Sequence, residues 1–303
     1  MRGHGSRADG AVDGTLALGL EQARARLTRL NVRAAKGLGQ HFLVDHRVLN
    51  TIVDAAELAS TDTVVEVGPG LGILTQELVN RAGMVVAVEL DEKLARALER
   101  FFHHRTGLSI VHGSILDFSP EELLADSIGS AKPPASYKVV ANLPYYVAAP
   151  TLRHFLESSL RPELMVVMVQ KEVGESVAAE PGSMSLLGVS VQVYGTPRIV
   201  DSVPARSFYP PPKVKSAIVR IDVHPKPAVD PDDISGFFDV VRAGFSSPRK
   251  QLRNSLSVGL NMGTAEAGGL LEAVGIAPER RPQTLSLSEW AALYRECAGT
   301  ISK

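Results

Sequence analysis

The sequence predicts an α/β fold built on a doubly wound, mostly parallel sheet, followed by a small C-terminal all-α domain. A series of nearly continuous apolar runs alternates with segments of helical periodicity, as happens when parallel strands are covered on both faces. Two further strand-like segments follow these runs. Beyond residue 226 the apolar residues recur only at helical spacing. A chain of 303 residues is long enough for two such domains.

The composition is that of a globular protein with a large core. The chain is 45% hydrophobic and has a formal net charge of −1. Its one cysteine, Cys297, rules out an internal disulfide and suits a reducing compartment. No apolar run approaches the length of a membrane span. We therefore expect a cytoplasmic monomer that associates with no membrane and holds no metal ion.

The first thirty residues are expected to be a flexible leader that contains a short helix. The chain begins with the polar, glycine-rich stretch MRGHGSRADGAVDG, which has no apolar signal core. Apolar residues then recur at helical spacing over residues 16–30. A larger domain, residues 31–226, is expected to follow this leader.

Each strand of the larger domain is predicted from an apolar run. The parallel strands are expected at residues 63–67, 84–90, 109–112, 137–143 and 164–170. Residues 197–203 and 215–224 are typical of a pair of strands that closes one edge of the sheet. The proline-rich stretch FYPPPKV separates them. The apolar residues of 186–194 fit both a strand and a helix, so that segment stays undecided.

The C-terminal domain, residues 227–303, is predicted to be entirely helical. Asp230-Pro231 and Ser247-Pro248 each place a capping residue before a proline, which is typical of a helix start. Ser286 and Glu289 have the spacing of a capping box, and apolar residues follow at helical intervals.

Basic residues are grouped along the chain although the net charge is close to zero. Such groups are most often solvated surfaces, but groups that share one face would suit a polyanion such as RNA. The three groups are Arg24, Arg26, Arg29, Arg33, Lys36 and Arg47; Arg206, Lys213, Lys215 and Arg220; and Arg242, Arg249, Lys250 and Arg253.

A glycine-rich loop, VVEVGPGLGILT, follows the first predicted strand and leads into a helix. Gly68, Gly70 and Gly72 allow a sharp turn and a close approach to a ligand. The spacing is GxGxG, whereas dinucleotide-binding proteins typically have GxGxxG. Glu66 at the strand end would repel a pyrophosphate and attract an ammonium group. The loop therefore favours S-adenosylmethionine over NAD as the cofactor.

Two further strand ends are expected to face the same ligand. Glu89 ends the second strand about twenty residues after Gly68, where an acidic residue that binds ribose hydroxyls belongs. Ser114 follows the third strand and is placed beside the adenine. Asp91 is interpreted as a helix cap. Open α/β sheets bind their ligands at the carboxyl ends of the strands, which is where these residues lie.

The motif NLPYY, residues 142–146, follows the fourth strand and provides groups that suit an adenine amine. Asn142 offers a side-chain oxygen and Leu143 a backbone carbonyl, and two acceptors would aim the nitrogen lone pair at a methyl donor. Pro144 stiffens the turn, and Tyr145 offers a stacking face for a flipped-out base. A turn with core aromatic residues is the structural alternative.

These motifs together resemble the KsgA-type ribosomal RNA adenine dimethyltransferases. The resemblance covers about residues 33 to 300. It implies a Rossmann-like class I methyltransferase fold and dimethylation at N6 of two adjacent adenosines near the 3′ end of 16S rRNA, coupled to assembly of the small ribosomal subunit. The matching stretches, in order, are KGLGQHFLVD, VEVGPGLGILT, VELD, ANLPYY, VQKEV, FYPPPKVKSAIVR and RKQLRNSL.

The resemblance also implies roles for individual residues. The target base would be held by Asn142 to Tyr145, with Phe208 as a second stacking face. RNA phosphates would be bound by Arg249, Lys250 and Arg253. The family usually has aspartate at the position of Ser114, so this pocket departs from the pattern. The cofactor would be bound by His41, Leu43, Gly68, Gly70, Glu89, Ser114 and Asn142.

Two other functions remain open at this point. A macrolide-resistance methyltransferase that acts on large-subunit rRNA shares an NLPY-like motif, but generally lacks PPPKV followed by a helical tail of this kind. A non-catalytic assembly factor for the small subunit is the alternative outside the enzymes, and Ser114 is the feature that favours it.

Overall fold

The structure is a computed structural model that describes residues 19–29, 40–229 and 234–301. It divides into two compact units. The first, here called the sheet unit, contains the described residues up to 174 together with 198–223. The second, the helical unit, contains residues 175–197 and the described residues from 224 onward. The domain bounds expected from the sequence stay a prediction about which parts fold on their own.

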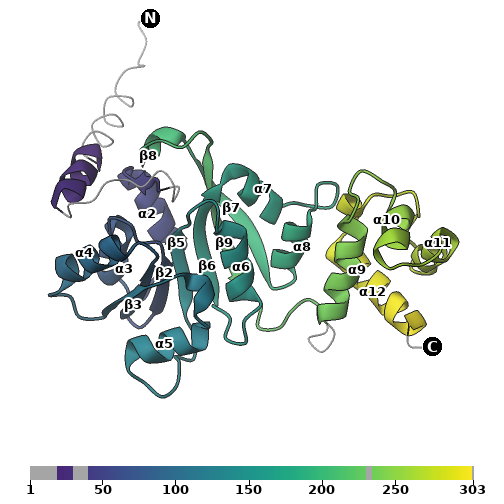
Figure 1. The fold of residues 1–303 in the computed structure, drawn as a ribbon, viewed down its shortest axis with the longest axis horizontal. Coiled ribbons are helices and arrows are strands. Elements are labelled where there is room, and N and C mark those ends of the chain that lie inside the picture. The colour runs from purple at the N-terminus through teal and green to yellow at the C-terminus, as the bar shows by residue number, and fades with distance from the viewer. Residues whose placement is uncertain (1–18, 30–39, 230–233, 302–303) are drawn as a thin grey trace, which may run out of the picture. The chain divides into compact units, whose positions relative to one another are not determined.

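The sheet unit is built on a seven-stranded sheet with the strand order β4-β3-β2-β5-β6-β9-β7 (Figure 1). The strands from β2 to β6 pair in parallel, and β9 runs antiparallel to β6. The expected parallel strands and the closing pair at one edge are therefore confirmed. The strands are β2 (Thr63–Val67), β3 (Met84–Glu89), β4 (Leu108–His112), β5 (Lys138–Asn142), β6 (Leu164–Gln170), β7 (Gly195–Val203) and β9 (Ser216–Val223).

Helices connect these strands and lie on both faces of the sheet (Figure 1). Local sequence sets where several of them begin. The carboxylate of Asp91 caps α4 by accepting from the backbone N–H groups of Lys93 and Leu94, which confirms its interpretation as a helix cap. Ser119 caps α5 in the same way. The helices are α2 (His46–Ala55), α3 (Ile73–Val79), α4 (Glu92–Phe102), α5 (Pro120–Ile128), α6 (Ala148–Leu156) and α7 (Lys171–Val177).

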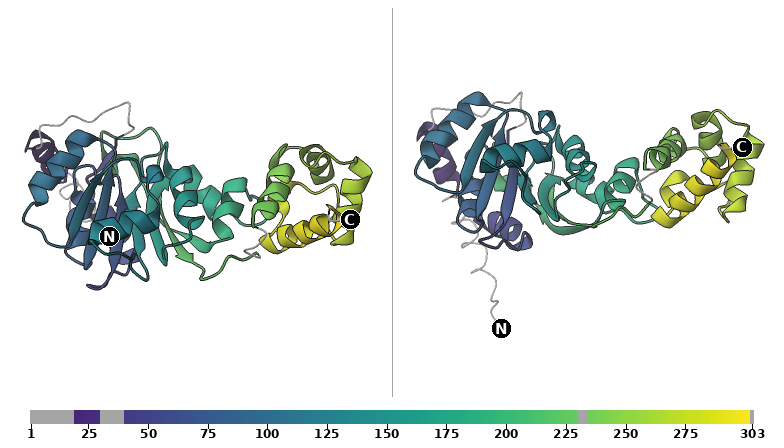
Figure 2. Two further views of the ribbon diagram at one scale, coloured as in Figure 1. Left: turned by 60° about the horizontal axis from the view of Figure 1, so that its bottom comes forward. Right: turned by 90° about the horizontal axis from the view of Figure 1, so that it is seen from below.

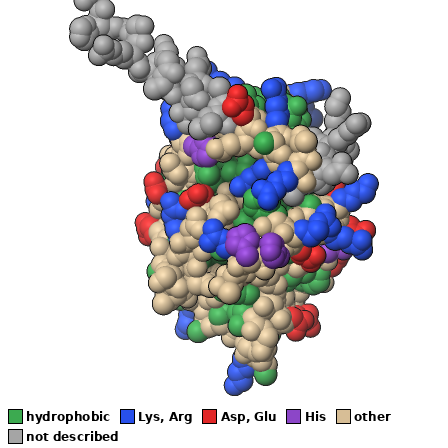
Figure 3. Space-filling model, turned by 90° about the vertical axis from the view of Figure 1, so that its left-hand side faces the viewer, with side chains coloured by type: hydrophobic (Ala, Val, Ile, Leu, Met, Phe, Trp, Pro, Cys, Tyr) green, Lys and Arg blue, Asp and Glu red, His purple; other side chains and the backbone are tan. Residues whose placement is uncertain are grey.

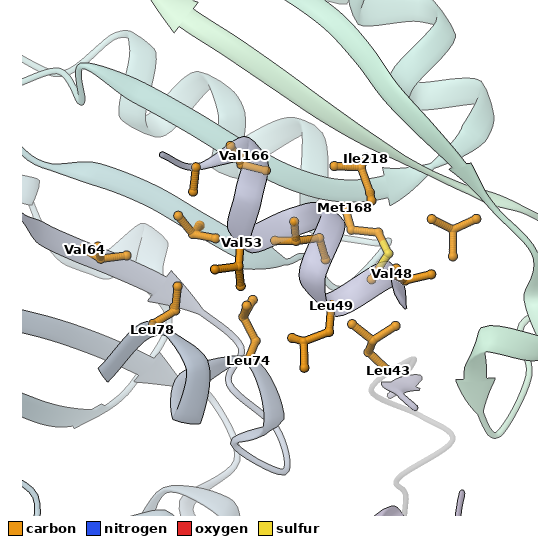
Figure 4. Close-up of a cluster of buried hydrophobic side chains, with 14 of the residues drawn as sticks. Leu43, Val48, Leu49, Val53, Val64, Leu74, Leu78, Val166, Met168 and Ile218 are labelled. Carbon is orange, nitrogen blue, oxygen red and sulfur yellow. The ribbon is translucent and has the colours of Figure 1, made fainter. Parts of the chain in front are cut away.

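A buried cluster joins α2, α3 and one face of the sheet. Leu49 and Val53 of α2 point toward Leu74 and Leu78 of α3 in Figure 4, and β-strand residues such as Val166 lie beyond α2. Each fully buried aliphatic side chain contributes roughly 1.5–3 kcal/mol. Because α3 starts at the glycine loop, this packing fixes the helix that carries the loop.

A second, two-stranded sheet ties the beginning of the unit to its end. Strand β1 (Phe42–Leu43) runs antiparallel to β8 (Phe208–Tyr209). Next to β1 lies a helix over residues 19–29, inside the range predicted for a helix. Its Ala23 is fully buried in a cluster with Phe42, Leu71 and Leu94. The rest of the expected leader lies outside the described residues.

Besides the last residues of α7 and the first residues of β7, the helical unit contains α8 (Leu186–Gln192) and a C-terminal group of helices, which is drawn in green and yellow in Figure 2. Residues 186–194, undecided from the sequence, contain α8, capped by Ser185. The capping box is confirmed, because Ser286 and Glu289 each accept from the other's backbone N–H. The C-terminal helices are α9 (Ile234–Phe245), α10 (Leu252–Gly259), α11 (Thr264–Ala273) and α12 (Leu287–Ile301).

One predicted helix start in this unit is wrong. Ser247-Pro248 does not begin a helix, because residues 246–250 form a turn and α10 begins at Leu252. The turn is closed by the Lys250 N–H, which donates to the Ser247 carbonyl at 2.9 Å, and by the Ser255 hydroxyl, which donates to the same carbonyl. Asp230-Pro231, the other predicted start, lies outside the described residues. Among the described helices, none has both the length and the apolar character needed to cross a membrane.

Candidate active site

The site lies where the strand order of the sheet reverses. From β2 the chain continues outward through β3 and β4, and then returns to the other side of β2 as β5. Such a switch point leaves a crevice outside the carboxyl ends of the two central strands. The loops that follow β2, β3, β4 and β5 line one cavity there, together with residues 40–43.

The glycine loop forms one wall of this cavity. Gly68, Gly70 and Gly72 have φ of 67°, 56° and 71°, a left-handed conformation that favours glycine. A side chain at Gly72 would also lie 2.8 Å from Leu98 and Phe102 of α4. The three glycines are therefore needed for the turn and for the close packing behind it, and Gly68 and Gly70 line the cavity.

Glu89, at the end of β3, holds the glycine loop in place. One carboxylate oxygen accepts from the Gly70 N–H at 3.0 Å, and the other accepts from the Asp91 N–H at 2.9 Å. Burial raises the pKa of the carboxyl group, although these hydrogen bonds oppose the rise. Each oxygen has a second lone pair, so Glu89 can hold the loop and still accept from a ligand hydroxyl.

Glu66 is a buried carboxyl group with unused hydrogen-bonding capacity. Glu66 borders the cavity and is 1% exposed. Oε2 has no hydrogen-bond partner among the described residues. Burial raises the pKa of Glu66 to about 8, and the neighbouring charge of Glu89 acts in the same direction. A positively charged donor in the cavity would satisfy this oxygen and stabilise its ionised form.

Ser114 lies in the cavity wall after β4, as the sequence predicts. Its hydroxyl oxygen already accepts from the Leu116 N–H at 3.3 Å and so caps the short 3-10 helix Ile115–Asp117. Leu90 and Ile115 line the cavity beside it, and Leu90 is 45% exposed. These apolar side chains provide flat contact area for a planar ring, and no sequence motif points to them.

His41 and Leu43 reach the cavity from the segment around β1. The His41 Nδ1–H donates to the Pro210 carbonyl at 2.7 Å, since a carbonyl can only accept. The backbone carbonyl of His41 accepts from the Asn142 side-chain amide at 3.2 Å. This bond uses the Nδ2 end of Asn142 as a donor, which leaves Oδ1 free as an acceptor.

The NLPY residues line the cavity next to the glycine loop. The Leu143 N–H donates to the Met168 carbonyl at 3.1 Å, and the Leu143 carbonyl accepts no hydrogen bond within the described part of the chain. Pro144 lies against the loop, because a side chain at Gly68 would be 3.4 Å from its ring. Asn142 and Leu143 thus present two free acceptor oxygens at this strand end.

Tyr145 lines the cavity next to His41. Its ring centroid is 5.7 Å from that of His41 at an interplanar angle of 31°. Its hydroxyl is hydrogen-bonded to the hydroxyl of Ser216 at 2.6 Å. Burial raises the pKa of the Tyr145 hydroxyl above its usual range. The next residue, Tyr146, also lines the cavity and is 57% exposed.

Phe208 does not have the position expected of a second stacking face. Its side chain is 2% exposed and belongs to the buried cluster around α2, and it is not among the cavity residues. The reason is its register in β8, where it pairs with Leu43, so its ring fills the core behind the site. This expectation is therefore corrected.

The basic groups are only partly free to bind a polyanion. Arg220 forms ion pairs with Glu57 and with Asp222, and these partners raise its pKa further. Arg24 lies over the ring of Tyr209, and both Arg26 and Arg29 lie over Phe101. On the face drawn in Figure 3, acidic side chains are interspersed among the basic ones. Arg33 and Lys36 lie outside the described residues.

The C-terminal basic group lies on the turn before α10 and on α10 itself. Arg249 and Lys250 are exposed, and neither forms an ion pair with a described residue. Arg253 is 3.5 Å from a carboxylate oxygen of Glu279, and Arg242 is paired with Asp239. Arg249 and Lys250 are therefore the cations of this group that are available to a phosphate.

The expectation that the protein holds no metal ion stays a prediction.

Comparisons with known proteins agree with the site geometry. The family model of ribosomal RNA adenine dimethylases matches residues 31–293. The chain is 48% identical over 283 residues to the ribosomal RNA small subunit methyltransferase A of Dehalococcoides mccartyi, covering 93% of this chain and 94% of that protein.

Two solved structures share the fold. The 23S rRNA methyltransferase ErmE is 25% identical with a TM-score of 0.66, covering 84% of this chain and 98% of ErmE. A dimethyladenosine transferase from Plasmodium falciparum is 22% identical with a TM-score of 0.69, covering 86% of this chain and 98% of that one. The family model matches most of the chain, and the Dehalococcoides mccartyi methyltransferase is 48% identical to it. The chain therefore belongs to the ribosomal RNA adenine dimethylase family.

Proposed function

We propose that this protein dimethylates N6 of two adjacent adenosines near the 3′ end of 16S rRNA, with S-adenosylmethionine as the methyl donor, during assembly of the small ribosomal subunit. The observation that carries the proposal is a single cavity. It joins a glycine loop with buried carboxyl groups to the free acceptor oxygens of Asn142 and Leu143. The name of the Dehalococcoides mccartyi relative supports the choice of the small subunit.

The residues of the cavity suit S-adenosylmethionine. The carboxyl group of Glu66 would attract the α-ammonium group, and Glu89 has lone pairs left for ribose hydroxyls. A pyrophosphate would meet two carboxyl groups at the same place, which argues against NAD. Leu90, Ile115 and Ser114 would border the adenine. When bound, the cofactor supplies an electrophilic methyl group on a sulfonium.

The NLPY residues would orient the target amine. The lone pair of an adenine amine is delocalised into the ring, which makes the nitrogen a weak nucleophile. Asn142 Oδ1 and the Leu143 carbonyl would each accept one N–H, drawing the nitrogen toward a tetrahedral geometry. Tyr145 would support the flipped base by stacking. Because the acceptors are fixed before the base arrives, the rate gain comes mainly from orientation.

The RNA outside the target base would be held by charge. Arg249 and Lys250, with a smaller contribution from Arg253, are proposed to bind phosphates. Such contacts position the substrate without reading its sequence. A purely structural assembly factor would have no use for the free acceptors at Asn142 and Leu143, so catalysis is the better account of the site.

A transfer experiment separates the candidate functions. Purified protein is incubated with labelled S-adenosylmethionine and with immature small subunits, mature small subunits or large subunits. We expect label in the RNA of immature small subunits. Label in large subunits alone would instead assign the macrolide-resistance type of activity. Tight binding to small subunits without transfer would indicate a non-catalytic assembly factor.

A further inference from the structure

Ser216 belongs to the stretch FYPPPKVKSAIVR, from which no role in the site follows, yet it contacts the residue proposed to support the target base. It is the first residue of β9, its side chain is fully buried, and its hydroxyl is 2.6 Å from that of Tyr145. Backbone pairing with Gln170 fixes its position in the sheet. A buried hydroxyl on a strand that has a neighbouring strand on each side is a rigid partner for a side chain at a cavity wall.

We propose that Ser216 is a positioning residue for methyl transfer, acting by holding the ring of Tyr145 in its stacking orientation. This inference rests on the proposed function. Pro144 restricts the backbone just before Tyr145, and the hydrogen bond to Ser216 anchors the far end of the side chain. With both ends held, the ring is ordered before the base arrives, so binding the base costs less side-chain entropy.

The position of the Ser216–Tyr145 hydrogen bond suits a role in orienting the Tyr145 ring more than a role in binding a ligand. The hydrogen bond lies at the far end of the Tyr145 side chain, at a residue that does not line the cavity, so Ser216 would touch neither ligand. Loss of the bond would leave the Tyr145 hydroxyl without this partner and allow the ring to leave its position. The effect should therefore appear in the rate of transfer, while cofactor affinity stays unchanged.

A double-mutant cycle tests the proposal. Ser216→Ala, Tyr145→Phe and the double variant are compared with wild type in methyl transfer to immature small subunits at saturating S-adenosylmethionine. We expect Ser216→Ala and Tyr145→Phe each to lower kcat by roughly tenfold, as the loss of one buried hydrogen bond allows. The double variant should lose no more than either single variant, and the KM for the cofactor should not change.

Controls separate positioning from folding. Ser190→Ala removes another buried hydroxyl, bonded to the Leu186 carbonyl on α8, and should keep the wild-type kcat. Urea unfolding of each variant reports on stability. If Ser216→Ala does not fold, Tyr145→Phe still removes the same hydrogen bond, and its kcat tests the same prediction.

The outcomes distinguish this inference from the proposed function. Wild-type protein that fails to methylate small subunits would overturn the proposed function and the role of Tyr145 with it. With an active wild type, a normal kcat in Tyr145→Phe would overturn the role of Ser216 alone. So would losses that multiply in the double variant, because they would mean that Ser216 acts by another route.

Discussion

The buried carboxyl group of Glu66 makes the stability of the protein depend on pH. Its carboxyl group is surrounded by protein, and its pKa is raised to about 8. The unfolded chain would titrate this group near its ordinary value, about 4.3. Between these two pH values the folded protein holds a proton that the unfolded chain has lost. The contribution of Glu66 to stability is thus fully present at low pH and is lost as the pH rises toward 8.

Glu66→Gln should remove this pH dependence. The free energy of unfolding of the variant, relative to wild type, is expected to increase between pH 5 and pH 8, by at most about 1.4 kcal/mol per pH unit. Urea unfolding without cofactor at several pH values measures the difference. Glu89 also has a raised pKa, but it is present in both proteins and cancels. A difference that stays constant with pH would show that Glu66 is ionised in the folded protein.

Ser114 provides a second prediction at this scale. A neutral hydroxyl stands where the family usually has a carboxylate, and it already accepts a hydrogen bond from Leu116. An aspartate could keep that cap and accept from the adenine amine with its other oxygen. Ser114→Asp should therefore bind S-adenosylmethionine several-fold more tightly, a gain of about 1 kcal/mol, with little change in saturated turnover. Calorimetry decides the point, and weaker binding in the variant would contradict it.

Some site residues can be predicted from sequence because of where strands end. Glu89 and Asn142 follow buried apolar runs, and parallel strands bring their carboxyl ends to one edge. Ser216 could not be predicted, since it meets Tyr145 across 71 residues of chain with no local pattern. Phe208 was misassigned because a motif does not give the direction of a side chain. The register of β8 turns it into the core.

At the scale of the elements, the helix over residues 19–29 supports the glycine loop of the candidate site. It packs on β1 and on the glycine loop through buried Ala23. Any side chain at Gly19 would lie 1.7 Å from the Val44 carbonyl oxygen, so the helix begins in direct contact with the backbone after β1. Arg26 donates to the Leu71 carbonyl at 2.9 Å and also lies over Phe101 of α4.

Arg26→Ala should weaken cofactor binding by up to about tenfold, because it removes a hydrogen bond to the loop that forms the cavity wall. Arg29→Ala is the matched control. Arg29 comes from the same helix and lies over the same ring, 5.1 Å from its centroid. Calorimetric titration with S-adenosylmethionine compares the two. Equal affinities in both variants would assign the helix no part in the cofactor site.

Helices and strands could be predicted where one sequence pattern determines the secondary structure. They could not be predicted where tertiary contacts determine it. The nearly continuous apolar runs of β2, β3, β5 and β6 are mostly buried, as expected for strands covered on both faces of a parallel sheet. Residues 186–194 fit two periods, and the cap from Ser185 settles them as a helix. Ser247-Pro248 has a helix-start signal, but Ser255 binds the Ser247 carbonyl and holds a turn there instead.

For the molecule as a whole, basic and acidic residues nearly balance, and part of the described basic residues are already paired. The net charge is −1, and several arginines are occupied by ion pairs or aromatic rings. A protein that binds RNA with so little net charge must rely on local cations. In the helical unit, Arg249 and Lys250 are exposed and carry no ion pair with described residues.

Replacing both Arg249 and Lys250 by alanine should reduce the salt dependence of RNA binding. For each cation that no longer binds a phosphate, the slope of log K against log salt is expected to fall by about one unit. A double variant of Arg81 and Arg96 is the matched control, because it also removes two charges, but from arginines paired with Glu77 and Glu92. Filter binding over a salt series measures both slopes. Equal slopes in the two variants would make this turn an ordinary solvated surface.

The most direct test of the central claim maps the modified bases. 16S rRNA is isolated from cells that lack the gene and carry either the wild-type protein or Asn142→Ala, and N6,N6-dimethyladenosine is located by mass spectrometry of RNA fragments. We predict two adjacent dimethylated adenosines near the 3′ end with the wild-type protein. Asn142→Ala, which loses one orienting acceptor, should transfer methyl groups roughly 10²-fold more slowly. Unmodified adenosines with wild type, or full turnover by Asn142→Ala, would contradict the account.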